Sequence, residues 1–420
     1  MSASIEHLAP VADRLQADLD ELSALADPDL DGWSRPVFSQ PYLAARDWVA
    51  TRMRDAGLRV RVDPAGNIIG TLEGRRPGRF LATGSHTDTV RGGGRFDGIV
   101  GVLGAIEAAR RLAETGTRLE HDLLVVDFLG EEPNDHGVSC IGSRAVSGRI
   151  SADYLAMPDP AGTPLADRIA DPAGLAAAAW PRGGLAGFVE LHVEQGPVLE
   201  REGIDIGVVT AIAGIERAVA SFHGRPDHAG TAPMSERRDA LMAAAQVVLA
   251  VEQIGCSHPG AVATVGRIES SPGSLNIVPS WARIWVELRS ADQPWLGRVH
   301  HDLARRITEV AQARGVDIDI DWLNDQPTVA TMPSVQNTIA AAATSAGYSW
   351  RAMPSGAGHD AAHLASLAPT GMIFVPSRAG RSHCPEEWTD LGAVCAGAHT
   401  LAASLVAMDA GPPTRAEAQL

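Results

Sequence analysis

FLATGSH (residues 80–86) predicts a buried β-strand that ends in polar residues. The run DLLVVDFLGEE (122–132) has the same form and ends in two glutamates. Between them, residues 98–116 carry apolar side chains at helical spacing. Buried apolar strands that alternate with helices are typical of an α/β domain with a mainly parallel mixed sheet flanked by helices. In such sheets the functional side chains lie beyond the carboxyl ends of the strands.

The same domain extends in both directions along the chain. A helix is predicted over residues 40–56, where Gly57 can end it, and strands are predicted at 58–62 and 67–74. Near the other end of the chain, GMIFVPS (371–377) is another apolar strand between helical segments. The two ends of the sequence therefore have the pattern of one α/β domain.

The middle of the chain has a different pattern. Strands that alternate in polarity are predicted from RAVASFHG (217–224), AVATVGRIES (261–270) and RIWVELRS (283–290). Alternating strands indicate an antiparallel sheet with one face covered by helices.

Two amphipathic helices, at about 235–252 and 293–314, can cover that face. We therefore predict an inserted α+β domain, with an antiparallel sheet and two helices, at residues 213–328. The catalytic domain is then formed by residues 1–212 and 329–420.

The composition limits the partners of the protein. The 420 residues carry a formal net charge of −16 at pH 7, and 45% are apolar. Single domains rarely grow beyond about 250–300 residues, so this length favours two cores. An acidic surface repels phosphate groups, so nucleic acid is not an expected partner. It does not attract small anions either, so binding of an anionic substrate requires local Arg or His side chains.

The four cysteines, Cys140, Cys256, Cys384 and Cys395, include no CxxC pair, which argues against a thiolate zinc site and a disulfide scaffold. The N-terminal segment has no basic region followed by an apolar run, and no stretch approaches 18 apolar residues. We therefore expect a cytoplasmic protein with no membrane span.

Possible metal ligands follow the first predicted strand. His86 ends this strand, and Asp88 and Asp97 follow in GSHTDTV and in the glycine-rich GGGRFDG. An imidazole and a carboxylate suit zinc, and a second carboxylate can orient the histidine ring. A capped turn with a hydrogen-bonded histidine is the alternative interpretation.

Glu131 and Glu132 end the second apolar strand. Adjacent carboxylates that leave a core strand are costly unless they are paired or bound to metal. Because neighbours on a strand point to opposite faces, one can bind a metal while the other faces a water molecule. A surface loop just beyond the strand is the alternative.

Three further histidines lie in similar segments: His192 in ELHVEQGP, His359 in SGAGHDA and His383 in VPSRAGRSH. A single histidine such as His192 is more often structural. Together, histidines and carboxylates at several predicted strand ends favour zinc or manganese, and two ions where one carboxylate bridges them.

The motifs of this chain occur in the order GSHTDTV, GGRFDG, the double glutamate, ELHVEQGPVLE, HAGTAPM, PGSLNIVP, SGAGHDA and VPSRAGRSH. In this order they resemble the hydantoinase/carbamoylase branch of the di-zinc aminoacylase and carboxypeptidase superfamily. The branch includes N-carbamoyl-L-amino acid hydrolases, yeast-type β-ureidopropionases and allantoate amidohydrolases. The resemblance covers roughly residues 30–405, and ELHVEQGP and SGAGHDA are specific to this branch rather than to the peptidases.

This resemblance implies a centre with two divalent metal ions per subunit. It implies that Glu131 is the general base, that Asp88 is the carboxylate that orients His86, and that Asp97 bridges both ions. Zinc is favoured, with manganese, cobalt or nickel as alternatives. The implied metal ligands are His86, Asp97, Glu132, His192 and His383.

The resemblance also implies how a small carboxylated ureido substrate is bound. Arg289 in VELRS and Asn276 in SLNIVP are implied to hold its carboxylate, and Gln195, His228 and Gly358 to line the site. Members of the branch are homodimers through the inserted domain, which is also a lid. His228 is therefore implied to reach in from the partner subunit and to assist catalysis.

The chain differs from the branch in two places. The residues before Arg289 are Glu and Leu, where an acidic residue and Ile are frequent. After His383 the chain reads CPEEW, so that Cys384 and Trp388 can edge the substrate pocket. For Trp388, a cap on the hydrophobic core is the preferred interpretation.

The expected reaction is hydrolysis of the C–N bond of an N-carbamoyl amino acid to the amino acid, ammonia and carbon dioxide. Allantoate amidohydrolase activity is the alternative within the branch. A dipeptidase or aminoacylase would use the same metal ligands. An inactive binding protein would have lost a ligand or Glu131, and this sequence retains all of them.

Overall fold

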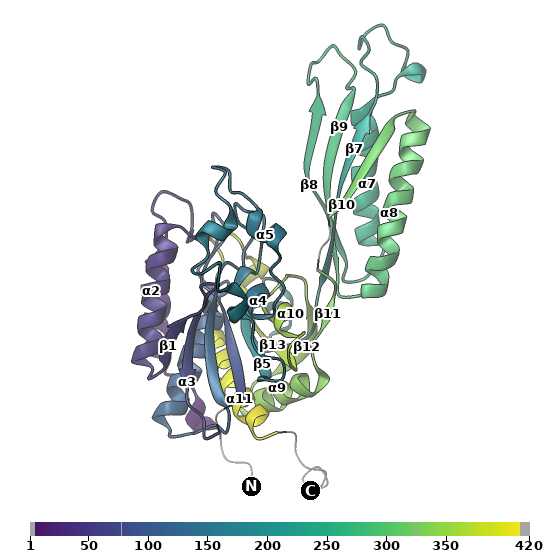
Figure 1. Cartoon of the computed structure of the whole chain (residues 1–420). Helices are drawn as coiled ribbons and strands as arrows, with labels where there is room; N and C mark the ends of the chain where they lie inside the picture. The colour runs from purple at the N-terminus through teal and green to yellow at the C-terminus, as the bar shows by residue number, and fades with distance from the viewer. Residues whose placement is uncertain (1–4, 77, 324–325, 412–420) are drawn as a thin grey trace. The chain divides into compact units, whose positions relative to one another are not determined.

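A computed structural model describes residues 5–76, 78–323 and 326–411 of the chain. The chain forms two compact units (Figure 1). Unit 1 contains the described residues of Met1–Thr210, Thr331–Met353 and His359–Leu420. Unit 2 contains those of Ala211–Ala330 and Pro354–Gly358. Unit 2 is therefore inserted, in sequence, within unit 1.

The larger sheet has nine strands in the described residues, in the order β1-β2-β4-β3-β5-β13-β6-β11, with β12 paired to β6. Its centre is parallel, because β3 pairs with β4 and β5, and β5 pairs with β13, in the same direction. Antiparallel pairs lie toward both edges. The strands are β1 (Arg59–Val62), β2 (Ile68–Leu72), β3 (Phe80–His86), β4 (Asp122–Phe128), β5 (Leu185–Val193), β6 (Ile206–Ile212), β11 (Val329–Ala330), β12 (Trp350–Ser355) and β13 (Thr370–Val375).

Helices flank this sheet and bury their apolar faces against it. α3 contacts β3, β4 and β5, while α10 contacts β5 and β13. The predicted α/β fold with a mainly parallel mixed sheet is confirmed. The helices of unit 1 are α1 (Ala12–Ser23), α2 (Gln40–Asp55), α3 (Ile99–Glu114), α4 (Ile141–Val146), α5 (Ala152–Ala156), α6 (Val198–Glu202), α9 (Pro333–Ser345), α10 (Ala361–Leu364) and α11 (Leu391–Asp409).

The helix α11 is long and apolar enough, by length and composition, to cross a membrane. In this fold it is a core helix that contacts α3, α9 and the strands β5 and β13. Val394, Leu401 and Leu405 are fully buried in the main hydrophobic cluster. Packing within unit 1 therefore accounts for the apolar surface of α11.

Unit 2 contains an antiparallel four-stranded sheet in the order β10-β7-β9-β8, with two helices on one face (Figure 1). Exposure alternates along β9, where Ile284 and Val286 are buried beneath the helices and Glu287 and Arg289 lie on the other face. The predicted inserted α+β fold is thus confirmed. Its elements are β7 (Gly214–His223), α7 (Ala240–Cys256), β8 (Val262–Ser271), β9 (Trp281–Ser290), α8 (Gln293–Arg314) and β10 (Asp317–Leu323).

Arg289 and Trp281, near the two ends of β9, lie at opposite ends of this sheet. Arg289 pairs with Ile215, close to the point where the chain enters unit 2. At the other end, Trp281 pairs with His223. An extended strand rises roughly 3.3 Å per residue, so about 26 Å separates Trp281 from Arg289.

Two of the element boundaries that differ from the predictions have a local cause. β4 ends at Phe128, because Gly130 has a φ of 56° in the left-handed region and turns the chain out of the strand. Glu131 and Glu132 therefore lie in a loop, and the prediction that they end the strand is wrong. α7 begins at Ala240 rather than near residue 235, because the side chain of Asp239 caps it.

Candidate metal centre

Three buried side chains meet at the carboxyl edge of the parallel strands. His86 is the last residue of β3, and His192 lies near the end of the neighbouring β5. Asp97 lies in the turn between β3 and α3. The next residue, Gly98, has a φ of 69°, and a Cβ on it would lie 2.5 Å from the ring of His86. The glycine therefore lets the backbone beside Asp97 pass close to His86.

The donor atoms form two groups that share Asp97. His86, Asp97 and His192 make up the first group, and Asp97, Glu132 and His383 the second, each with donor atoms within 4.8 Å of one another. Nε2 of His192 is 3.2 Å from Asp97 Oδ1, whereas Nε2 of His383 is 2.9 Å from Asp97 Oδ2. Nε2 of His383 is also 3.2 Å from Glu132 Oε1. Asp97 therefore presents one oxygen to each group, as a bridging ligand would.

Hydrogen bonds fix the position of the proton on two of the rings. Nδ1 of His86 lies 3.0 Å from the main-chain oxygen of Asp88, and Nδ1 of His192 lies 2.9 Å from that of Val193. A carbonyl oxygen can only accept, so both Nδ1 atoms donate and the lone pairs of Nε2 remain for the donor groups. This is the form in which histidine binds metals, and imidazole nitrogen with carboxylate oxygen suits zinc. The residues present therefore fit divalent metal ions.

Asp88 is fully buried and holds the loop that carries the two glutamates. Its Oδ1 accepts the N–H of Glu131 at 3.2 Å, and its Oδ2 accepts the N–H of Glu132 at 3.0 Å. Burial raises the pKa of Asp88 to about 6. The carboxylate is 3.7 Å from Nδ1 of His86, so the main-chain oxygen of Asp88 is the nearer partner of that ring. The carboxylate thus orients the Glu131–Glu132 loop directly.

Glu131 belongs to neither donor group. Its Oε2 is 3.6 Å from Nε2 of His86, and its Oε1 accepts a hydrogen bond from the thiol of Cys140 at 3.4 Å. Burial raises the pKa of Glu131 well above its usual range; His86 opposes this shift and the charge of Glu132 adds to it. A carboxyl group beside the centre that is not a ligand is suited to proton transfer.

The cluster as a whole favours positive charge. Burial alone would lower the pKa of His86, but Glu131 and the neighbouring carboxylates raise it well above its ordinary value. Hydrogen bonds with Asp97 and Glu132 raise the pKa of His383 to about 11. Carboxylates that raise the pKa of these imidazoles would likewise stabilise metal ions, to which the neutral rings bind through Nε2.

Two residues at the centre have positive φ angles without being glycine, Gln195 at 58° and His383 at 55°. Nε2 of Gln195 donates to Asp97 Oδ2 at 3.0 Å, whereas its Oε1 is buried and has no hydrogen-bond partner in the described part of the chain. An unpaired buried acceptor is costly unless a ligand donates to it. His383 is half exposed, so the centre opens to solvent on the side of this ring.

A third donor group, formed by Glu190, His192 and His359, lies buried in the same region. The two oxygens of Glu190 already accept hydrogen bonds, from Ser85 Oγ at 2.7 Å and from the N–H of Ala361 at 2.9 Å. These bonds join β3, β5 and the start of α10. We therefore assign Glu190 a structural role behind His192.

Other substrate-binding candidates lie in unit 2. Nε of Arg289 donates to Glu287 at 2.6 Å, and Nη1 donates to the main-chain oxygen of Gly356 at 3.3 Å. Glu287 also accepts from Arg217 at 2.7 Å. Burial alone would raise the pKa of Glu287, but its bonds with the two arginines hold this pKa below the usual range. Gly358 ends the short segment 354–358 of the same unit.

His228 and Asn276 lie at the opposite end of that sheet from Arg289, in the loops after β7 and before β9. The N–H of Ala229 donates to the main-chain oxygen of Asn276 at 3.0 Å and holds the two loops together. Nδ1 of His228 accepts from the N–H of Gly230 at 3.1 Å, so the neutral ring carries its proton on Nε2. Both side chains are exposed.

The sequence interpretation missed a buried carboxylate behind Asp97. Glu387 accepts hydrogen bonds from the N–H groups of Phe96 and Asp97 and from the hydroxyl of Ser382. It lies in the segment CPEEW beside the exposed Glu386, and no local pattern shows which of the two glutamates faces inward.

Cys384 and Trp388, at the two ends of the segment CPEEW, are both half-buried. Trp388 is half-buried beside the main hydrophobic cluster, edge-to-face with Phe96 at 5.4 Å. The guanidinium groups of Arg95 and Arg378 lie over its ring. Cys384 is a half-buried free thiol. These contacts of Trp388 are those of a cap on the core.

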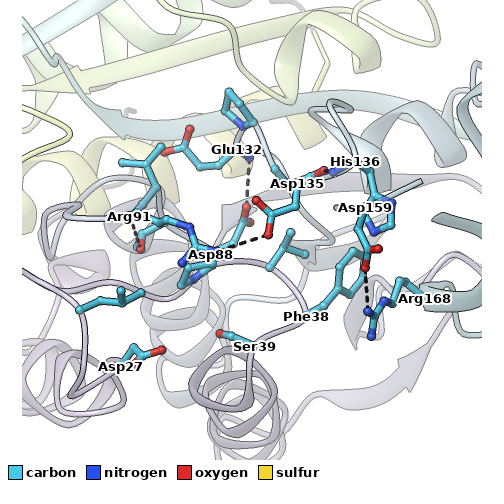
Figure 2. A pocket seen from close by; sticks show the side chains of 17 residues that line it. Asp27, Phe38, Ser39, Asp88, Arg91, Glu132, Asp135, His136, Asp159 and Arg168 are labelled. Atoms are coloured by element: carbon cyan, nitrogen blue, oxygen red, sulfur yellow. Dashed lines mark hydrogen bonds and ion pairs between the residues drawn. The ribbon is translucent and has the colours of Figure 1, made fainter. Parts of the chain in front are cut away.

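A cavity of about 580 Å³ adjoins the metal centre within unit 1 (Figure 2). Glu132 contributes to its wall, and the ion pairs Arg91–Asp135 at 3.3 Å and Arg168–Asp159 at 2.9 Å lie around it. A cavity of this size with charged walls suits a small polar molecule.

The donor groups and the two-unit architecture agree with a known family. Residues 82–407 match the sequence profile described as Peptidase family M20/M25/M40. The chain belongs to this family.

Within the M20/M25/M40 family, the chain is similar to amidohydrolases. It is 38% identical over 405 residues to the N-carbamoyl-L-amino-acid amidohydrolase of Paenarthrobacter aurescens, covering 95% of this chain and 98% of that protein. It is 34% identical over 368 residues to the allantoate amidohydrolase of Bacillus subtilis, covering 85% and 88%. A solved amidase of the hydantoinase/carbamoylase family from Burkholderia multivorans has a TM-score of 0.86 and 33% identity, covering 97% of this chain and 100% of that one.

These comparisons confirm the resemblance to the hydantoinase/carbamoylase branch. They also confirm the prediction of a hydrolase that acts on carbon–nitrogen bonds. The M20 family is metal-dependent, and the structure contains residue groups that could bind metal.

Proposed function

We propose that this protein hydrolyses the C–N bond of an N-carbamoyl (ureido) amino acid, giving the amino acid, ammonia and carbon dioxide. The observation that carries the proposal is the carboxylate of Asp97, whose two oxygens each face one group of metal donors. The ureido class is supported by relatives named for N-carbamoyl-L-amino acids and allantoate. Allantoate amidohydrolase activity is the second candidate for the same reason.

The proposed centre holds two divalent ions, with zinc favoured and manganese, cobalt or nickel as alternatives. Such ions lower the pKa of water to about 7 and polarise a carbonyl group. Glu131 accepts the proton of the attacking water on its carboxylate and transfers it to the leaving nitrogen. The proposed ligands are His86 and His192 for one ion, Glu132 and His383 for the other, and Asp97 for both.

Two further side chains have free polar atoms that suit a ureido group. Oε1 of Gln195 is a buried acceptor without a partner among the described residues, and we propose that it accepts an N–H of the substrate. His228 carries its ring proton on Nε2 and is proposed to donate it in a hydrogen bond to the oxygen that becomes negative during attack. Donors of this kind contribute roughly 3–4 kcal/mol in other hydrolases.

The substrate carboxylate is proposed to bind Arg289. Glu287 holds Nε of this arginine, so the Nη edge of its planar fork can make two parallel hydrogen bonds to a carboxylate. Arg289→Ala is expected to lower kcat/KM. The lost stabilisation of the transition state should be roughly 2–5 kcal/mol, the range for breaking a buried charge pair. Arg289→Lys should also lose activity, because an ammonium group does not reproduce the fork. Steady-state kinetics on a ureido acid measure both losses.

The same experiment needs a substrate control and a charge control. A ureido amide that lacks the carboxylate should be a poor substrate, and Arg289→Ala should reduce its hydrolysis much less than that of the acid. Arg305→Ala removes a cation of unit 2 that pairs with Asp302 and Glu309 on the exposed side of α8, and should change neither rate. Equal hydrolysis of acid and amide by the wild type would rule out a carboxylate clamp at Arg289.

We further propose a homodimer in which each site uses both subunits. Arg289 lies about 26 Å along β9 from the end that carries His228 and Asn276, so one copy of unit 2 is not expected to bring all three to one substrate. His228 and Asn276 of the partner subunit would then complete the site. Leu275, next to Asn276, is fully exposed, as a residue at an interface would be in a single chain.

The dimer surface is proposed to include α7 and the edge strand β8. Leu249 on α7 is 59% exposed and Val262 on β8 is 56% exposed. β8 is the last strand of its sheet, and an unpaired edge beside apolar side chains is a ready surface for a second copy.

Mixing two inactive variants tests the shared site. His228→Ala and Glu131→Gln homodimers should each be inactive, whereas a mixed dimer has one site with both defects and one with neither. After subunit exchange we expect about one quarter of the wild-type specific activity, since half of the dimers are mixed. Mixing Glu131→Gln with Glu132→Ala is the matched control, because both changes lie in unit 1, and it should restore nothing. An active monomer in sedimentation would contradict the proposal.

The proposed reaction is tested by comparing products from several substrates. Release of ammonia from N-carbamoyl amino acids would support it, and ammonia from allantoate alone would favour the second candidate. Release of amines from dipeptides without ammonia would identify a peptidase instead. Metal binding without any product would leave only a binding function.

We also propose a cytoplasmic enzyme. All four cysteines are free thiols in the structure, as is usual in a reducing compartment. Fractionation of cells that express the tagged chain would test this location, and recovery outside the cytoplasm would contradict it.

A further inference from the structure

Glu387 connects two distant segments of the metal centre. Its side chain is buried, with 1% exposure, and Oε1 accepts the N–H of Phe96 at 2.8 Å and of Asp97 at 3.0 Å. Oε2 accepts the hydroxyl of Ser382 at 2.7 Å, and Ser382 directly precedes His383. The carboxylate of Glu387 thus links the backbone of Asp97, which belongs to both donor groups, to the loop that carries His383.

Gly94 leaves space for the carboxylate of Glu387, and no cationic side chain of the described residues pairs with this carboxylate. A Cβ on Gly94 would lie 2.2 Å from Cδ and Oε1 of Glu387, so only glycine fits beside it. Within residues 5–76, 78–323 and 326–411, the carboxylate has no ion pair with Arg, Lys or His. A buried carboxylate without a cation is costly, so its hydrogen bonds and its surroundings must offset that cost.

We propose that Glu387 is a positioning residue that fixes Asp97 and the His383 loop in the places that a pair of metal ions requires. This inference rests on the metal centre of the proposed function. The two amide hydrogen bonds fix the direction in which Asp97 leaves its turn. The hydroxyl of Ser382 is also 3.4 Å from Asp97 Oδ2, so the same link reaches the side chain of Asp97. The positive charge of the ions would balance the buried carboxylate of Glu387.

The test measures metal binding rather than turnover. Zinc affinity is measured by competition with a chromophoric chelator, and the geometry of the site by the visible spectrum of the cobalt-loaded protein. Glu387→Ala removes the acceptor of three hydrogen bonds and should weaken zinc binding about 10–100-fold, as changes behind metal ligands do. It should also alter the cobalt spectrum. Glu387→Gln keeps an oxygen that can accept both amides, so it should lose less affinity than Glu387→Ala.

Glu386→Ala is the matched control. Glu386 is the neighbouring carboxylate, exposed and paired with Arg381 at 3.0 Å, and its loss should leave zinc affinity and the cobalt spectrum unchanged. A folded Glu387→Ala variant with wild-type affinity and spectrum would overturn the inference and leave the metal centre intact. Absence of metal binding by the wild type would overturn the proposed function itself.

Thermal unfolding of the metal-free variants shows whether Glu387→Ala folds. If it does not, Glu387→Gln and Ser382→Ala provide the test, because Ser382 is only half-buried and its loss leaves both amide hydrogen bonds in place. Each is expected to fold and to weaken zinc binding several-fold. Wild-type affinity in both variants would overturn the inference.

Discussion

Removal of divalent metal from the purified protein is expected to abolish hydrolysis. An amide carbonyl is a poor electrophile and neutral water a poor nucleophile, and divalent ions are proposed to activate both. The donor atoms of His86, Asp97 and His192, and those of Asp97, Glu132 and His383, lie close enough to hold such ions. Treatment with a strong chelator, followed by elemental analysis and an ammonia assay, measures the effect.

Re-addition of metal provides the control for this experiment. Zinc, manganese, cobalt or nickel should each restore some activity to the stripped protein, whereas the chelator's own metal complex should not inhibit. Circular dichroism of the metal-free chain distinguishes loss of the ions from loss of the fold. Full activity in protein that elemental analysis shows to be free of metal would remove the two-metal mechanism.

Glu131→Gln is expected to retain metal and to lose turnover. The carboxamide has nearly the same shape as the carboxylate but cannot accept the proton of the attacking water. Loss of a general base typically costs about 10²–10⁴ in rate, so kcat should fall by this factor while metal content stays the same. Glu131 lies outside both donor groups, with Oε2 3.6 Å from Nε2 of His86, which is why its loss should not release the ions.

The neighbouring glutamate provides the contrast. Glu132→Ala removes a donor of the second group and should weaken metal binding, so part of its lost activity should return at high metal concentration. Kinetics and metal titrations on the two variants separate these roles. If both variants lose metal alike, or both keep it, the assignment of Glu131 as base and Glu132 as ligand is wrong.

Much of the fold could be predicted because the central strands are short apolar runs. β3 has the predicted bounds, Phe80–His86, since a strand buried on both faces is almost continuously apolar. The end of β4 could not be placed, because Leu129 continues the apolar run and only the backbone of Gly130 ends the strand. β10 was not predicted, since DIDIDWL contains aspartates that are disfavoured in strands.

The clustering of these side chains was predictable where it depends on strand ends and not where it depends on distant pairing. His86 and His192 could be placed together because parallel strands bring their carboxyl ends to one edge. Glu387 could not be linked to Asp97, which lies 290 residues earlier in the chain. The separation of Arg289 from His228 follows only from the register of β7 and β9, which the motifs do not contain.

Gln195 and His383 both have left-handed backbone conformations. For a residue with a Cβ this conformation is disfavoured by roughly 1–2 kcal/mol, so a chain selected for stability alone would have glycine at both positions. Side chains at these positions therefore lower the stability of the native state. Less stability then remains to offset other destabilising mutations. A screen for heat-resistant variants would therefore tend to select glycine at these two positions, and the most stable chains that it returned would lack two of the groups that face Asp97.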